Sequence, residues 1–194
     1  ALRIGAARGT VDEELASRVS HGLHQLPGAI EEVLRREGEA EKAAMLVRDA
    51  EDMYFIGRGL DYAVAMEGSL KLKEISYLHS EAMPAGELKH GTLALITEGV
   101  PVVVILTQRA VYDKTISAVQ EVKARGGMVI AVAYDSDTEV EKHADHVIRI
   151  PDMEDLLAPV AAVVPLQLLA YHVASLRGHD IDQPRNLAKS VTVE

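Results

Sequence analysis

Apolar residues recur every three or four positions from Thr10 to about Ala50, a period that is typical of amphipathic helices. The recurring residues are Leu15, Val19, Leu23, Leu26, Ile30, Val33 and Leu34. Pro27 and Gly28 interrupt the pattern, so we expect two helical pieces in this segment rather than one. Acidic residues crowd both pieces, as they do on solvated helix faces.

After residue 50 the pattern changes to short apolar runs rich in β-branched residues, which predict strands. The runs are residues 52–57, 101–107, 128–134 and 145–150. Three of them are almost uninterruptedly apolar, which is typical of strands covered on both faces in a parallel sheet. Helix-length segments at 61–77, 109–125 and about 154–176 alternate with the strands. The sequence therefore predicts an α/β fold, with a doubly wound parallel sheet and helices on both sides.

Composition narrows the classes of function. The formal charge of −10 argues against a nucleic-acid partner, because phosphate backbones are bound by surplus Lys and Arg. The longest apolar runs are too short to span a bilayer, so no membrane segment is expected. There is no cysteine, which suits a reducing cytoplasm and excludes thiolate chemistry within this chain. The first residues include neither an initiator Met nor a signal-like pattern, so we expect a fragment or a processed product.

Candidate chemistry is concentrated in residues 67–91, where many charged side chains stand in an otherwise apolar neighbourhood. Glu67, Lys71 and Glu74 are spaced four and three apart, so their side chains leave the same face of the predicted helix. They are either ion pairs on a wet surface or a carboxylate held beside an ammonium, able to move a proton next to a carbonyl. Downstream, His90 is either a packed or solvated histidine or an acid–base group.

Two further segments are candidates for binding. The run Gly57-Arg58-Gly59 follows a predicted strand and precedes a helix, where its amides could face an anion, although glycine pairs at such turns are more often structural. The polar tail from residue 180 onward contains Pro184 and a single lysine, Lys189. Polar tails commonly fray, but a lysine near an open-chain ketose could form a Schiff base or neutralise an oxyanion.

Two long motifs, LKLKEISYLHSEAMPAGELKHG and DQPRNLAKSVTVE, resemble the C-terminal isomerase half of the glucosamine-6-phosphate synthase family, the glutamine–fructose-6-phosphate aminotransferases. The resemblance covers roughly residues 50–194. It implies a sugar isomerase (SIS) domain, a flavodoxin-like three-layer αβα sandwich with a parallel sheet. It also implies three parts: helices over residues 1–50 from the end of a preceding SIS domain and a linker, the SIS domain over 51–178, and a tail over 179–194 that contributes to the active site.

The resemblance implies a role for each matching side chain. Glu74 matches the base that moves a proton between C1 and C2 of the sugar phosphate, and Lys71 and Ala188 match substrate-binding positions. His90 matches a histidine that assists ring opening from the neighbouring subunit of a homodimer. Lys189 matches a lysine that contacts the open-chain ketose or forms an imine with it.

Glu67 and Arg58 are expected to support the site, and the resemblance implies no metal or organic cofactor. The implied reaction of the intact enzyme converts fructose 6-phosphate and glutamine-derived ammonia to glucosamine 6-phosphate, for amino-sugar (UDP-N-acetylglucosamine) biosynthesis. The family's first SIS domain and its cysteine-dependent glutaminase domain have no counterpart in these residues, so the isolated chain is expected to be inactive or incomplete. Two alternatives stay open: a sugar-phosphate isomerase or deglycase, and a non-catalytic sugar-phosphate-binding module.

Overall fold

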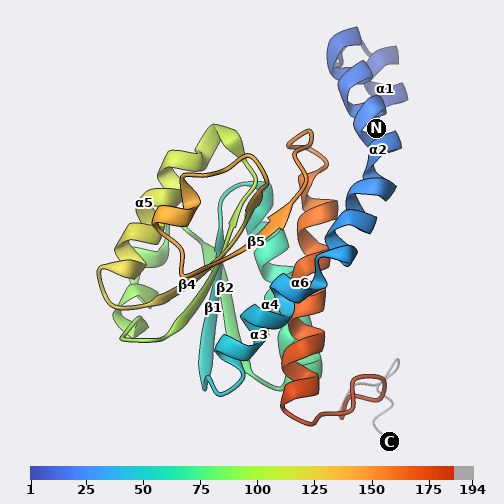
Figure 1. Ribbon diagram of the computed structural model, residues 1–194. Helices are drawn as coiled ribbons and strands as arrows, with labels where there is room; N and C mark the ends of the chain where they lie inside the picture. Colours follow the sequence, from blue (N-terminus) through green and yellow to red (C-terminus); the bar gives the residue numbers. More distant parts are fainter. Residues whose placement is uncertain (186–194) are drawn as a thin grey trace, which may run out of the picture.

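A five-stranded parallel sheet forms the centre of the protein in a computed structural model, which describes residues 1–185 (Figure 1). The strands are β1 (Asp52–Gly57), β2 (His79–Pro84), β3 (Pro101–Leu106), β4 (Met128–Tyr134) and β5 (His146–Ile150). Their spatial order is β2-β1-β3-β4-β5, and all neighbours are parallel. This is the flavodoxin-like order, whose direction of winding reverses between β1 and β3.

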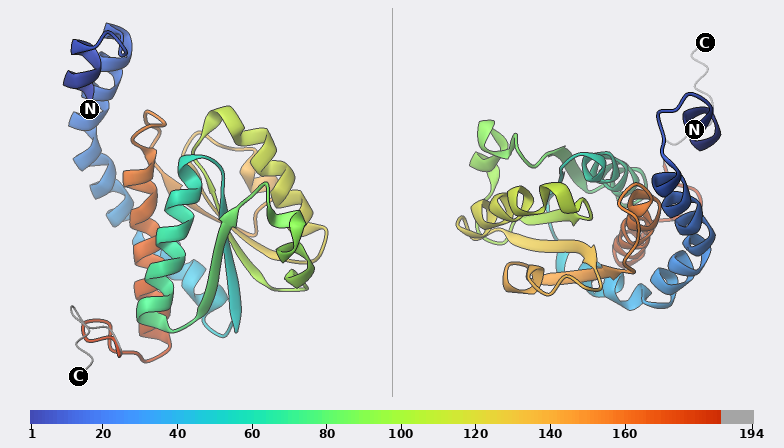
Figure 2. Two further views of the ribbon diagram at one scale, coloured as in Figure 1. Left: turned by 180° about the vertical axis from the view of Figure 1, so that it is seen from behind. Right: turned by 90° about the horizontal axis from the view of Figure 1, so that it is seen from above.

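Helices cover both faces of the sheet and give three layers (Figure 2). The α-helices are α1 (Leu2–Ala7), α2 (Glu13–Arg35), α3 (Glu37–Val47), α4 (Leu60–Ser76), α5 (Tyr112–Lys123) and α6 (Ala158–Leu176). Short 3-10 helices are η1 (Leu88–His90), η2 (Thr92–Leu95), η3 (Arg109–Val111) and η4 (Val140–Lys142). One face packs against α3, α4 and α6, and the other packs against α5 and the short turns. The predicted α/β fold with a doubly wound parallel sheet is confirmed.

Successive side chains of each strand point to opposite faces of the sheet, so the hydrophobic core has two halves, one on each face. Met53 and Phe55 point to the side of α4 and α6, whereas Tyr54 and Ile56 point to the side of α5. Helix α4 lies close to its neighbours because Gly68 has no side chain. A Cβ there would stand 2.6 Å from Cδ1 of Leu166 on α6. This close approach fixes the helix that carries most of the candidate chemistry.

The sequence analysis predicted no strand over residues 79–84, which form β2. This strand lies at the edge of the sheet and pairs only with β1 among the described strands. Its sequence HSEAMP is half polar, with Ser80 buried and His79 and Glu81 exposed. An edge strand is solvated on one side and lacks the continuous apolar run that marked the central strands.

The predicted break at Pro27 is wrong. Helix α2 runs through Pro27 without interruption and ends at Arg35, so that the break comes at Arg36. A proline removes one backbone hydrogen bond of a helix. The turns on either side are nevertheless held to the core, by Leu26 on one side and Val33 on the other.

Helix α6 corrects the expectation that no segment is long enough to span a membrane. This helix is long and apolar enough to cross a membrane by length and composition alone, with 19 residues and a mean hydropathy of 1.5. In the structure α6 packs between α3 and α4 and buries residues such as Ala161, Leu166 and Leu169. A central helix of a globular domain has this same composition, so α6 is accounted for as a core element.

The candidate residues lie at two opposite edges of the sheet, one formed by the amino ends of the strands and the other by their carboxyl ends. Helix α4 begins at Leu60, just after the carboxyl end of β1, and it ends at Ser76, just before the amino end of β2. Asp52 and His79, the first residues of β1 and β2, lie side by side in register. The last turns of α4 therefore lie at the amino edge of the sheet, while the loops after β1 and β2 lie at the carboxyl edge.

Candidate functional site

Three charged side chains form a chain of contacts along the outer face of α4. Lys71 Nζ donates a hydrogen bond to Glu74 Oε2 at 2.6 Å, and it lies 3.7 Å from Glu67 Oε1. The side chain of Glu74 is 24% exposed, that of Lys71 34% and that of Glu67 41%. The structure therefore brings together the three residues that the spacing grouped, on a face that is open to a ligand.

The contact with Glu74 further favours the charged form of Lys71. The hydrogen bond from Lys71 to Glu74 raises the pKa of the lysine, against a smaller opposing effect of burial. Glu67 adds a weaker attraction in the same direction. Lys71 is consequently an ammonium at neutral pH, which suits it to neutralise a developing negative charge rather than to act as a nucleophile.

The chain that follows α6 returns to the end of α4. The backbone N–H of Arg185 donates to the hydroxyl oxygen of Tyr77 at 2.7 Å, and its guanidinium lies 4.1 Å from the centre of the Tyr77 ring. The ring of His179 packs edge-on against the same tyrosine, with centroids 4.7 Å apart. Tyr77 comes three residues after Glu74, so the beginning of the tail is held at the end of the helix that carries the Lys71–Glu74 pair.

Tyr77 is a residue that the sequence analysis missed. It caps α4 in the left-handed region at φ 57°, where it is the single non-glycine residue with positive φ among residues 1–185. Such a conformation is costly for an aromatic residue and is retained where the surrounding structure requires it. No pattern in the sequence indicated that this tyrosine would hold the tail.

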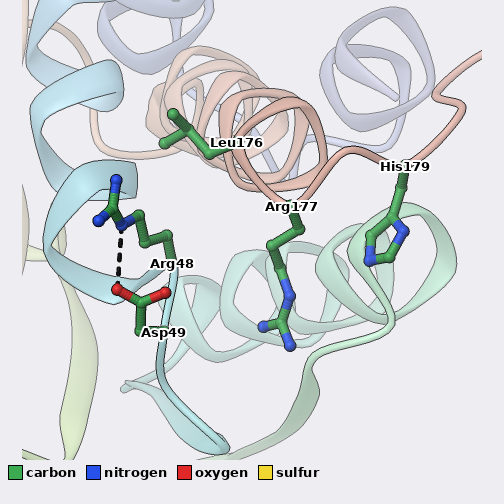
Figure 3. Close-up of a pocket in the computed structure, with 5 residues that line it drawn as sticks. All are labelled: Arg48, Asp49, Leu176, Arg177 and His179. Atoms are coloured by element: carbon green, nitrogen blue, oxygen red, sulfur yellow. Dashed lines mark hydrogen bonds and ion pairs between the residues drawn. The ribbon is translucent and has the colours of Figure 1, made fainter.

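A hollow of about 520 Å³ opens at the same edge of the sheet (Figure 3). Its lining residues are Arg48, Asp49, Leu176, Arg177 and His179. Arg48 is neutralised by Asp49, whose Oδ2 lies 3.0 Å from its Nε. Arg177 and His179 extend in the same direction from the end of α6 and the segment after it. This hollow therefore adds polar groups beside the tail, but most of it is open to solvent.

His90 and Arg58 lie at the opposite edge. His90 belongs to η1, after the carboxyl end of β2, and its Nδ1 lies 2.7 Å from Glu87 Oε2. Arg58 follows the carboxyl end of β1. From the first residue of α4 to Glu74 the helix rises about 20 Å. Within one chain, the structure does not bring His90 or Arg58 together with the Lys71–Glu74 pair.

The remaining predicted residues, Ala188 and Lys189, lie outside the described residues. Within residues 1–185, no group of three or more His, Asp or Glu side chains is arranged to hold a metal ion.

A buried carboxylate at the carboxyl edge was also missed. Asp61, 1% exposed in the first turn of α4, accepts hydrogen bonds from the backbone N–H groups of Thr107 at 2.8 Å and Gln108 at 3.1 Å. The hydroxyl of Thr107 donates to its other oxygen. Burial raises the pKa of Asp61, although these hydrogen bonds act to lower it. Asp61 thereby ties α4 to the turn after β3, where the winding of the sheet reverses.

Comparisons with known proteins agree with this architecture. The SIS domain family matches residues 46–177. Over all 194 residues the chain is 51% identical to the glutamine–fructose-6-phosphate aminotransferase (isomerizing) of Symbiobacterium thermophilum and 52% identical to that of Thermus thermophilus. It spans 32% of the length of each of these relatives. The solved C-terminal domain of glucosamine-fructose-6-phosphate aminotransferase from Francisella tularensis is similar at a TM-score of 0.88, with 38% identity over 94% of this chain and 52% of that one.

Proposed function

Because the chain belongs to the SIS domain family, we propose that it is the C-terminal isomerase domain of a glutamine–fructose-6-phosphate aminotransferase. The observation that carries the proposal is the Lys71–Glu74 pair, presented on an open helix face beside the tail. In the intact enzyme, a preceding SIS domain completes the sugar-phosphate site and a glutaminase domain supplies ammonia. Fructose 6-phosphate is the substrate, glucosamine 6-phosphate is the product, and the cytoplasm is the compartment.

The chemistry of the pair fits an isomerisation. After ammonia attacks the C2 carbonyl of the open-chain sugar, the carbonyl oxygen leaves as water to give an imine, and a proton must then move from C1 to C2. Glu74 is the base that removes the proton and returns it, and the ammonium of Lys71 stabilises the negative charge that develops between these steps. Lys71 is hydrogen-bonded to the base itself, so that the cation and the carboxylate are held at a fixed separation. Glu67 supports the pair by its own attraction to Lys71.

The tail supplies the second amine of the proposed site. Arg185 is anchored on Tyr77, and Lys189 follows four residues later, within about 14 Å of extended chain. Tyr77 in turn lies about 4.5 Å along the helix axis from Glu74. We therefore propose that Lys189 contacts the open-chain ketose or forms an imine with it, and that Ala188 lines the site.

His90 acts from a second copy of the chain in this proposal. Its side chain is largely exposed at the carboxyl edge, while Glu74 lies near the amino edge of the same sheet. One site can contain both residues only if two subunits contribute to it. A homodimer in which His90 assists ring opening in the neighbouring site satisfies this geometry.

Replacing Glu74 by Gln in the intact enzyme tests the assignment of the base. We expect formation of glucosamine 6-phosphate and deuterium entry at C1 in D₂O to fall by about 10²–10⁴-fold, the usual contribution of a general base. Glu41→Gln, an exposed change on α3, is the matched control and is expected to leave both rates unchanged. Turnover of the Glu74→Gln enzyme within a few-fold of the wild type would refute the assignment.

Mixing two inactive variants tests the shared site. Glu74→Gln and His90→Gln homodimers are dissociated, combined in equal amounts and allowed to reassociate. If each site takes Glu74 from one subunit and His90 from the other, half of the dimers are mixed and each has one intact site, which restores about a quarter of the wild-type activity. No recovery from a mixture that forms mixed dimers would show that both residues act within one subunit, and a His90→Gln homodimer that kept its activity would show that His90 is not part of the site.

A further inference from the structure

A second hollow, at the carboxyl edge of the sheet, is not used by the proposed reaction. It has a volume of about 160 Å³ and lies between the turns after β1 and β2 and the outer surface of α5. Its charged lining residues are Arg58, Lys89, Lys114 and Glu121. By the same kind of measure a single water needs only about 10–15 Å³, so the hollow has room for a ligand of several heavy atoms.

The charge of this hollow is opposite to that of the protein. Three of its side chains are cations and one is a carboxylate, whereas the whole chain carries a formal charge of −10. Within residues 1–185, Arg58, Lys89 and Lys114 make no salt bridge, although many other Lys and Arg side chains do. Gathering like charges without neutralising them costs electrostatic energy, which an anionic ligand would recover.

Arg58 is held in position without an acceptor. Its Nε is buried and has no hydrogen-bond partner among the described residues. The guanidinium lies directly against Gly86, where an added Cβ would stand 2.8 Å from Nη1 of the arginine. The glycine therefore gives the guanidinium the space that it occupies. A planar guanidinium positioned in this way is suited to bind the oxygens of a phosphate group.

We propose that the hollow formed by Arg58, Lys89 and Lys114 is an anion site that takes a phosphate group, either free or as the monoester of a small metabolite. Loops at the carboxyl ends of parallel strands are where open α/β sheets bind ligands. The site is separated from the Lys71–Glu74 pair by most of the length of α4. It is thus separate from the Lys71–Glu74 pair of the same chain, and its binding of phosphate can be measured without the proposed reaction.

Titration of the 194-residue chain with inorganic phosphate at constant ionic strength, followed by backbone amide NMR, tests the site. We expect saturable shifts at the amides of Gly86 and Lys89. Arg58→Gln should weaken binding by at least about tenfold, because a charge-assisted hydrogen bond is lost, and Lys114→Gln should weaken it several-fold. Lys42→Gln removes the same charge from an exposed position on α3 and should leave the affinity unchanged.

Two results would overturn the proposal: absence of saturable shifts at Gly86 and Lys89, or equal weakening by Lys42→Gln and Arg58→Gln. The amide spectrum of each variant without ligand verifies that it is folded, and Lys89→Gln replaces Arg58→Gln if the latter is not. A parallel titration with fructose 6-phosphate separates the two sources of the phosphate. Tighter binding than inorganic phosphate at these amides indicates a monoester site, and equal binding indicates that only the phosphate group is recognised.

The same titration distinguishes this proposal from the proposed catalytic function. Glu74→Gln should bind inorganic phosphate at the hollow as the wild type does, whatever its effect on turnover. If fructose 6-phosphate shifted amides near Glu74 while neither ligand shifted those near Gly86, the result would support the catalytic site and refute the anion site.

Discussion

Replacing Asp61 by Ala is the sharpest test of how the carboxyl edge is held together. The change removes the acceptors of three donors: the backbone N–H and hydroxyl of Thr107 and the backbone N–H of Gln108. Thr107 is fully buried, and each buried donor that loses its partner costs about 1–3 kcal/mol. Two effects offset part of the summed cost of the three donors: the variant no longer buries a carboxylate, and water that enters the site pairs with some of the donors. We therefore expect a net loss of about 3–4 kcal/mol in the free energy of unfolding.

Urea unfolding followed by circular dichroism measures this loss, with an unchanged slope expected for a change in stability alone. For a chain of this size the melting temperature should fall by about 6–16 °C. Asp113→Ala is the matched control, because Asp113 is exposed in the first turn of α5 and should contribute about 1 kcal/mol or less through the helix dipole. A loss for Asp61→Ala within about 1 kcal/mol of the control would refute the reasoning.

Two further predictions concern Asp61 and Tyr77. Burial raises the pKa of Asp61 above its ordinary value of 3.8, so the folded protein binds the proton more tightly than the unfolded chain. The unfolding free energy of the wild type minus that of Asp61→Asn should therefore fall as pH rises from about 4 through the raised pKa; an increase would contradict this. Tyr77→Ala removes the ring and the hydroxyl that hold Arg185, so trypsin should cleave after Arg185 faster than in the wild type. Tyr171→Ala on α6 is the control and should leave this rate unchanged. Equal cleavage rates in the two variants would refute the anchoring role.

The central strands could be predicted from the sequence because they are buried on both faces. β3 and β4 consist of apolar residues along almost their whole length, and each contributes alternate side chains to the two halves of the core. β2 could not be predicted in the same way, because an edge strand needs only part of its surface to be apolar. The parallel α/β fold and the family relationship drawn from the two long motifs are confirmed by the structure and the comparisons.

In the candidate site, too, contacts between residues close in the sequence could be predicted, whereas contacts between distant segments could not. Helical spacing alone predicted that Lys71 would meet Glu67 and Glu74, and the structure brings them together. Contacts between segments far apart in the chain had no such signal. The anchoring of Arg185 on Tyr77 depends on where α6 ends, and it could not be read from either segment alone. The catalytic roles themselves stay predictions until the variants are measured.

Proximity in the sequence was misleading for residues 67–91, which look like one cluster of titratable groups. The strand β2 passes through the middle of this stretch, and in a parallel sheet a strand carries the chain from one edge to the other. Glu74 therefore remains at the amino edge, and Lys89 and His90 are carried to the carboxyl edge. Because β2 was not recognised from the sequence, neither was this separation. The physical consequence is that each copy of the domain presents two different polar surfaces, so any site that uses both Glu74 and His90 requires two copies of the chain.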